Sequence, residues 1–456
     1  MRRPLAVSLA LLLTVGVSQS RAGVSPVVPS APGTVQTSAN VRHVGTIPLD
    51  GAGVSMQLVR VGKQLRAFVS GAAGLSIYDA TDPLKPTLLG HLPMYNWENE
   101  AIAVSPDGKT TFLTEFDGAL YLHVVDVSNP LLPHIVGSIV PGGAHTVECA
   151  DPKCDYLFGS EGQTYDVRDH AHPKQLPDAQ SWGALLGAGR SGHNLHKDAS
   201  GLWISDTSPL IAFRLNPDPL HLKKVTTGDI TLNTQYQHNN IRPRAERFKT
   251  RTTTNGPLRD GELLLGEGET NFAPECDGTN GAFSTWSMVG FDHGRKMKQI
   301  DTLRPVSGTV PGFLAGANPA VNVMGCSGHW FTQKDGRDGS ILVAAAWYEH
   351  GTRFLSVNPR TGKIKQVGYF QPNRGATSAA YWIPGTDVVW SVDYHSGIDI
   401  MQFDQDPKKV PTTAKIDASW LSRLDTDPFA EAVRRLCIAG ANATAQQHAK
   451  LHEAAP

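Results

Sequence analysis

Short apolar segments that end in turn residues recur along the whole chain. Leu-Ser-Ile-Tyr-Asp-Ala-Thr-Asp-Pro at residues 75–83 returns as Leu-His-Val-Val-Asp-Val-Ser-Asn-Pro at residues 122–130. Apolar and β-branched residues before an Asp-Pro or Asn-Pro turn are typical of β-strands. Weaker copies of this unit begin at Thr164, Ile211, Trp286, Phe354 and Ile398. The pattern therefore predicts seven copies of one strand-and-turn unit.

A second phrase, an apolar residue followed by Gly and then by more apolar residues and a Pro, follows several copies of the first. It occurs at residues 89–93, 136–141 and 367–372. It also occurs once, at residues 44–48, before the first full repeat, and nothing like it follows the seventh. A ring of blades requires this displacement when an N-terminal strand completes the last blade and leaves no open edge.

Two further strands fit between these units, because turn signals such as Ser-Pro-Asp-Gly at residues 105–108 lie there. Four strands per repeat predict an all-β fold, a seven-bladed β-propeller over residues 42–410 with ring closure by the N-terminal strand. An array of β-sandwiches is the main alternative. The displaced N-terminal phrase argues against it.

The phrase Val-Val-Asp-Val-Ser-Asn-Pro at residues 124–130 resembles the LVIVD-repeat family of secreted or surface propellers of bacteria. The resemblance covers most of residues 42–407 and is strongest in the first repeats. It implies the fold and export from the cell. It does not imply an activity, because propellers carry many unrelated functions.

Both ends of the chain differ from the repeats. Arg2 and Arg3, the apolar run 5–17 and a small-residue end at Ala22 are typical of a signal peptide over residues 1–22. An N-terminal membrane anchor is the alternative. We expect a secreted protein with no transmembrane segment after removal of the signal. Residues 23–41 are expected to be a flexible lead-in, and residues 411–456 a short C-terminal helical extension.

Charge and cysteine content narrow the function classes. The 456 residues carry 41 basic and 42 acidic side chains, so the chain has no basic footprint for a phosphate backbone, and nucleic acid is not an expected partner. Export to an oxidising compartment favours disulfides among the five cysteines. We expect a Cys149–Cys154 bond, and Cys276–Cys326 is the next plausible pair.

Histidines recur in phase with the predicted blades. Alignment of the repeats places five polar side chains at the start of the innermost strand in blades 2 to 6, around one mouth of the central channel: Glu100, His145, His193, His238 and His329. Loops that reach the same mouth add Glu269, His350 and His395. We predict that the four histidines His145, His193, His238 and His329 bind a metal. Glu100, Glu269, His350 and His395 are the candidate catalytic or orienting groups.

Neutral imidazole suits several divalent transition metals, and Zn or Mn would fit. Fe or Cu is favoured, because all-imidazole coordination with a vacant position is common in redox chemistry. The sequence hypothesis is therefore a metal-dependent oxidoreductase, or a metal-dependent lyase, that takes a small-molecule ligand or substrate at the channel mouth. The alternative is a non-catalytic binding or scaffold propeller in which the histidines are structural.

Overall fold

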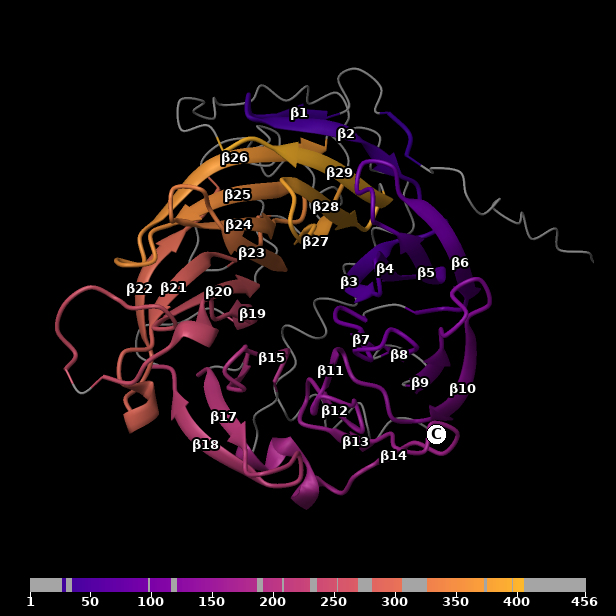
Figure 1. The fold of residues 1–456 in the computed structure, drawn as a ribbon, viewed down its shortest axis with the longest axis horizontal. Coiled ribbons are helices and arrows are strands. Elements are labelled where there is room, and N and C mark those ends of the chain that lie inside the picture. Colours follow the sequence, from indigo (N-terminus) through magenta and orange to yellow (C-terminus); the bar gives the residue numbers. More distant parts are fainter. Residues whose placement is uncertain are drawn as a thin grey trace, which may run out of the picture.

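Seven antiparallel sheets, six of four strands and one of five, form a closed ring in the computed structural model (Figure 1). The structure describes residues 27–29, 35–96, 99–115, 121–186, 192–206, 209–229, 236–251, 253–269, 281–305, 326–372, 375–395 and 397–405. The predicted seven-bladed β-propeller is therefore confirmed. No helix in these described ranges is long and apolar enough to cross a membrane.

The strands follow one another from the channel outward in each of the first four blades. Blade 1 contains β3 (Gly53–Val61), β4 (Gln64–Gly71), β5 (Gly74–Asp79) and β6 (Thr87–Pro93). Blade 2 contains β7 (Ala103–Val104), β8 (Thr110–Glu115), β9 (Tyr121–Asp126) and β10 (His134–Ile139). Blade 3 contains β11 (Val147–Cys149), β12 (Tyr156–Gly159), β13 (Thr164–Asp166) and β14 (Lys174–Gln175). Blade 4 contains β15 (Leu195–Lys197), β16 (Trp203–Ser205), β17 (Ile211–Leu215) and β18 (Leu222–Thr227).

The remaining blades keep this order. Blade 5 contains β19 (Tyr236–Ile241), β20 (Leu263–Glu269), β21 (Phe283–Ser287) and β22 (Lys298–Leu303). Blade 6 contains β23 (Phe331–Asp335), β24 (Ile341–Ala346), β25 (Thr352–Val357) and β26 (Ile364–Pro372). Blade 7 contains β27 (Thr377–Trp382), β28 (Val388–Asp393), β29 (Gly397–Phe403) and β2 (Val41–Ile47). Short 3-10 helices occur at η1 (Asp178–Gln180), η2 (Trp182–Leu185), η3 (Ala245–Arg247) and η4 (Phe291–His293).

The first repeated unit forms the third strand of every blade, and the second forms a fourth strand, as in β6, β10 and β26. The displaced N-terminal copy is β2, which pairs antiparallel with β29 from Val41 opposite Phe403 to Ile47 opposite Ile398. Figure 1 shows this indigo strand beside the yellow end of the ring. Ring closure by the N-terminal strand is therefore confirmed.

The segment before β2 is more ordered than the sequence suggested. β1 (Val35–Thr37) pairs with β26 as a fifth strand of blade 6, and Val28 forms a bridge with Thr46. The Asn40 side chain also donates to the Val367 carbonyl of β26 over 2.9 Å. Val28 and residues 35–37, which belong to the predicted lead-in, therefore pair with strands of the propeller. The predicted signal peptide and C-terminal helix lie outside the described residues.

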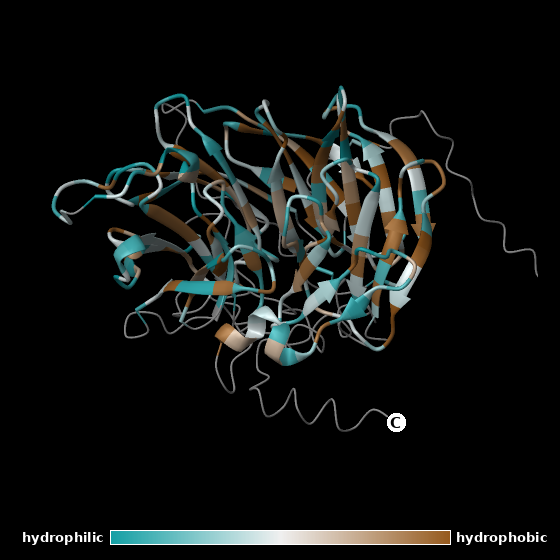
Figure 2. Ribbon diagram, turned by 60° about the horizontal axis from the view of Figure 1, so that its bottom comes forward, coloured by the Kyte–Doolittle hydropathy of each residue, from teal (hydrophilic) through white to brown (hydrophobic). Residues whose placement is uncertain are grey.

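Each blade is buried on both faces because neighbouring blades pack against it. On β25, Phe354 packs toward blade 7 with Trp382, whereas Leu355 packs toward blade 5 with Phe283. Figure 2 shows the resulting apolar bands along the strands. This two-sided burial explains why the repeated strands are nearly continuous apolar runs and do not alternate with polar residues.

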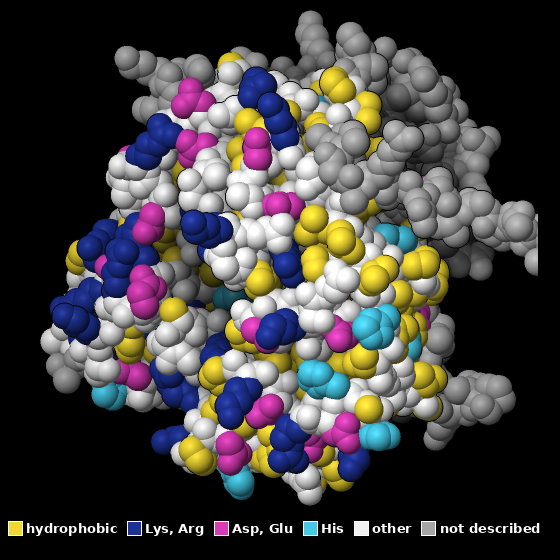
Figure 3. Space-filling model, turned by 45° about the vertical axis from the view of Figure 1, so that its right-hand side comes forward, with side chains coloured by type: hydrophobic (Ala, Val, Ile, Leu, Met, Phe, Trp, Pro, Cys, Tyr) yellow, Lys and Arg dark blue, Asp and Glu magenta, His cyan; other side chains and the backbone are white. Residues whose placement is uncertain are grey.

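The predicted Cys149–Cys154 disulfide is present, with its Cα atoms 4.7 Å apart. It closes the turn between β11 and β12. Cys276, the expected partner of the buried Cys326, lies outside the described residues. On the surface, acidic and basic side chains are interspersed over the face in Figure 3, in keeping with the formal net charge of -1.

Candidate metal centre

Five polar side chains from five consecutive blades meet at one mouth of the channel. Glu100 precedes β7, His145 precedes β11, His193 precedes β15, His238 lies in β19 and His329 precedes β23. All five are buried, with exposed fractions between 0% and 5%. Because each innermost strand starts at the same face of the ring, equivalent positions in successive blades converge. The phase of the sequence repeats predicts this arrangement.

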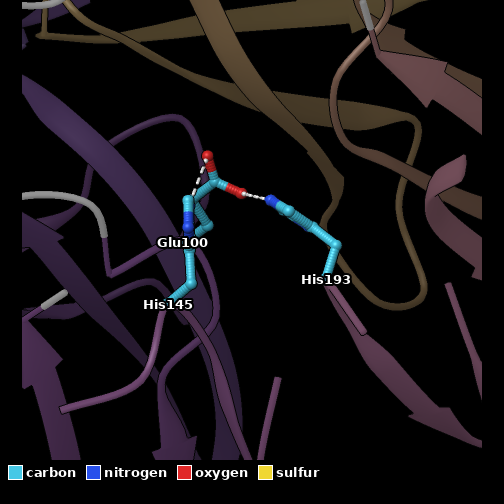
Figure 4. Close-up of side chains that lie close together, drawn as sticks. All are labelled: Glu100, His145 and His193. Carbon is cyan, nitrogen blue, oxygen red and sulfur yellow. Dashed lines mark ion pairs between the residues drawn. The ribbon is translucent and has the colours of Figure 1, made fainter. Parts of the chain in front are cut away.

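The carboxylate of Glu100 lies at the centre of the four imidazoles. Its Oε1 atom is 2.8 Å from Nε2 of His329 and 3.2 Å from Nε2 of His145. Its Oε2 atom is 3.1 Å from Nε2 of His238 and 3.5 Å from Nε2 of His193. Figure 4 shows the carboxylate between the His145 and His193 rings. All four Nε2 atoms therefore face one small region.

Backbone carbonyls fix the orientation of two of these rings. Nδ1 of His238 lies 3.0 Å from the carbonyl oxygen of His329, and Nδ1 of His329 lies 2.6 Å from that of Ser378. A carbonyl oxygen only accepts hydrogen bonds, so both Nδ1 atoms donate. In the neutral ring, Nε2 then carries a lone pair and no hydrogen.

With this tautomer, the Nε2 lone pair of His238 points at carboxylate oxygens, which also carry lone pairs. The bare Nε2 of His238 faces Glu100 Oε2 at 3.1 Å and also faces Glu269 Oε2 at 3.5 Å. Two acceptors at such distances repel each other unless a proton or a metal cation lies between them. The site geometry therefore calls for positive charge at the centre of the cluster.

Protons can supply only part of that charge. Burial alone would raise the pKa of Glu100, but the surrounding imidazoles outweigh it and hold the pKa well below its usual value. Burial lowers the pKa of His238 and lowers that of His193 well below the ordinary histidine value. The pKa of His329 is raised, because the attraction of Glu100 overcomes the effect of burial. The neutral imidazoles of His193 and His238 thus remain available as metal ligands.

Among the described residues, the donor atoms form three triads in which all atoms lie within 4.8 Å of one another. The triads are Glu100 with His145 and His193, Glu100 with His238 and His329, and His193 with His238 and Glu269. These buried groups could hold a metal ion. The donor set of imidazoles and carboxylates suits a first-row transition metal.

Two aromatic residues complete the surroundings, and sequence reasoning missed their roles. The indole Nε1 of Trp330 donates to Glu100 Oε2 over 3.2 Å. The Tyr348 hydroxyl donates to Glu269 Oε1 over 2.6 Å. The position of Trp330 directly after His329 was the signal that placed it at the mouth.

Two other predicted residues lie apart from the triads. His350 is buried in the turn between β24 and β25, where its backbone N–H donates to the Trp347 carbonyl. His395 is half-buried in the turn after β28, where its backbone N–H donates to Asp393. Both occupy turn tips and not strand starts. No triad among the described residues contains either histidine.

Comparisons with known proteins add the fold alone. No protein-family model matches the chain, and no curated protein matches it. The propeller domain of Cps50 (Swd1) from Myceliophteria thermophila is 11% identical with a TM-score of 0.49, over 78% of this chain and 98% of that one. A 6-phosphogluconolactonase-like protein of Bacteroides uniformis is 12% identical with a TM-score of 0.50, over 75% of this chain and 90% of that one. At such identity the likeness is one of architecture.

Proposed function

We propose that this chain is an exported metalloprotein that acts as a metal-dependent oxidoreductase on a small molecule at the channel mouth. Nε2 atoms of His145, His193, His238 and His329, together with the Glu100 carboxylate, would hold the ion. Fe or Cu is the favoured metal, because it would supply the redox chemistry that imidazole ligands support. The observation that carries the proposal is the bare Nε2 of His238, aimed at the Glu100 carboxylate.

Charge balance supports a divalent ion. Neutral imidazoles add no charge, whereas Glu100 and Glu269 are acidic groups buried to 1% and 3% exposure. A buried carboxylate without a counter-charge is costly, and a divalent cation at the centre of the cluster offsets that cost. The Trp330 indole then orients Glu100, and the backbone carbonyls orient the imidazoles, as the outer partners of metal ligands commonly do.

The substrate would approach from blades 3 and 4. The side chains of His145 and His193 keep 7% and 6% exposure, whereas those of His238 and His329 keep none. The rings of Tyr348 and Trp330 pack beside His329 on the other side of the cluster, with centroids 4.7 and 6.4 Å away. A small molecule would reach the cluster on the side of His145 and His193, where the remaining exposure lies.

Export remains part of the proposal. The apolar N-terminal segment and the resemblance to LVIVD-repeat propellers favour it, and the Cys149–Cys154 disulfide is compatible with an oxidising compartment.

Elemental analysis of protein purified from its exported route tests the metal. We expect a stoichiometric transition metal that is lost in the double variant His193→Ala and His238→Ala. The double variant His170→Ala and His172→Ala, which changes an exposed turn of blade 3, should keep it. Metal-free protein with all four site histidines and unchanged stability would contradict the proposal and favour the scaffold alternative.

A further inference from the structure

Tyr348 links the candidate metal centre to a carboxylate at its edge. Its hydroxyl donates to Glu269 Oε1 over 2.6 Å, and its ring lies 4.7 Å from that of His329. The side chain is fully buried. The other carboxylate oxygen of Glu269 lies 3.5 Å from Nε2 of His238. Tyr348 therefore holds one oxygen of a carboxylate whose other oxygen faces the centre.

The backbone of Tyr348 is strained. Its φ angle is 25°, a value that a bulky residue rarely adopts. Two backbone N–H groups, from Gly351 and Thr377, donate to its carbonyl oxygen over 2.9 Å each, which pins the conformation between blades 6 and 7. Strain of this kind clusters at functional sites. The fold therefore keeps a strained backbone at the residue whose phenol lies beside Glu269.

Glu269 contacts fewer of the imidazoles than Glu100 does, and at a longer distance. Glu100 contacts Nε2 of all four histidines within 3.5 Å. Glu269 belongs to one triad only, with His193 and His238, and its contact with His238 is longer than that of Glu100. Glu269 is close enough to become a ligand, yet its other oxygen is engaged by the phenol.

We propose that Tyr348 holds Glu269 beside the metal and not on it, so that the coordination position next to His193 and His238 stays open to a small exogenous ligand. This inference rests on the proposed metal centre. His193 is one of the two histidines with residual exposure, so the open position lies on the accessible side. Without the phenol, the Glu269 carboxylate would be free to swing onto the ion and occupy that position. Tyr348 is thus a positioning residue.

Cobalt(II) and azide provide the test. Cobalt is a spectroscopic substitute whose visible absorption reports coordination number, and azide is a small anion that binds open positions. We expect the cobalt-loaded protein to bind azide, and Tyr348→Phe to weaken that binding at least about tenfold. The double variant Tyr348→Phe with Glu269→Gln should recover the original affinity, because an amide is a poor ligand. Tyr394→Phe changes a neighbouring ring, 6.0 Å from Tyr348, and serves as the matched control.

The outcomes separate the two proposals. Failure of the protein to take up cobalt contradicts the metal centre itself. Cobalt uptake without an azide response, or equal azide affinity in the Tyr348→Phe variant, overturns this inference alone. The single variant Glu269→Gln does not depend on the stability of any Tyr348 variant. If it alters the cobalt spectrum before azide is added, Glu269 is a ligand and the inference is wrong.

Discussion

Nδ1 of His238 donates to the carbonyl oxygen of His329 over 3.0 Å, so one candidate ligand is oriented by the backbone of the next. His329 repeats the relationship with Ser378, the following blade's residue. Blades 6 and 7 therefore orient the imidazoles of His238 and His329, which belong to blades 5 and 6.

Glu100→Gln should weaken metal binding by at least about a hundredfold. The substitution keeps the shape of the side chain but removes the negative charge at the centre of the four imidazoles. Competition with a chromogenic chelator measures the affinity. Glu115→Gln, which changes another buried glutamate of blade 2 outside the triads, should bind metal as the original protein does. Equal affinities in the two variants would show that Glu100 is not a ligand.

Removal of β2 should open the ring. A chain that starts at residue 49 loses the pairing with β29 and the burial of Ile47, whereas a chain that starts at residue 35 keeps both. We expect the shorter chain to unfold at lower urea concentration and to self-associate through the exposed edge of β29. Urea titration and size-exclusion chromatography measure these effects.

A point variant tests the same ring closure without removing β2. Asp399 of β29 accepts a hydrogen bond from Thr46 over 2.6 Å and lies 3.0 Å from Nε2 of His43, both on β2. Asp399→Ala should destabilise the protein by about 1–3 kcal/mol, because it removes an acceptor shared by two part-buried side chains. A variant as stable as the original would mean that the contacts of Asp399 with Thr46 and His43 contribute nothing to the free energy of unfolding.

Arg353→Met should leave the protein as stable or make it up to about 4 kcal/mol more stable at neutral pH. The guanidinium is fully buried; Nη2 donates to Gln371 over 3.1 Å, while Nε and Nη1 have no hydrogen-bond partner among the described residues. As a matched control, Arg242→Met breaks a buried 2.6 Å pair with Asp198 and should cost about 3–5 kcal/mol. Urea unfolding measures both.

The same variant has a pH signature. Burial lowers the pKa of Arg353 from its ordinary value to about 9. The folded protein therefore holds this proton less tightly than the unfolded chain does, so folding becomes more favourable as pH rises above about 9. The methionine variant lacks this gain, and its stability advantage should shrink between pH 7 and pH 10. An unchanged advantage would contradict the assignment.

Loss of the Cys149–Cys154 disulfide should have a modest effect. The bond closes a short turn, with the two cysteines five positions apart, and the chain-entropy estimate for so small a loop is about 2 kcal/mol. The double variant Cys149→Ser and Cys154→Ser should therefore unfold at lower urea concentration but still form the ring. Failure of that variant to fold at all would show that the turn nucleates blade 3.

The sequence predicts the propeller well because each blade repeats the same local signals. The third-strand phrase and the displaced copy at residues 44–48 suffice for the number of blades and for the closure. The phase of the repeat also predicts that Glu100 and the four histidines converge, since equivalent strand starts share one face. Periodicity carries this information without any knowledge of side-chain contacts.

Features that depend on contacts between different blades cannot be predicted from the sequence repeats. The Tyr348–Glu269 hydrogen bond joins blades 6 and 5, and the Trp330–Glu100 bond joins blades 6 and 2. Neither follows from repeat spacing. The pairing of β1 with β26 is equally invisible, because a three-residue strand rich in polar side chains lacks an apolar pattern. His350 and His395 share the predicted face but sit at turn tips, where a small change in turn shape redirects the side chain.

Ring closure by β2 also sets an order of events during synthesis. Blade 7 needs residues 41–47 and residues 397–403 together, so it forms only after nearly the whole propeller has left the ribosome. All the donors of the candidate metal centre come from blades 2 to 6, which are complete by then. His329, however, needs the Ser378 carbonyl of blade 7 for its orientation, so the candidate centre reaches its final geometry only when the last blade has formed.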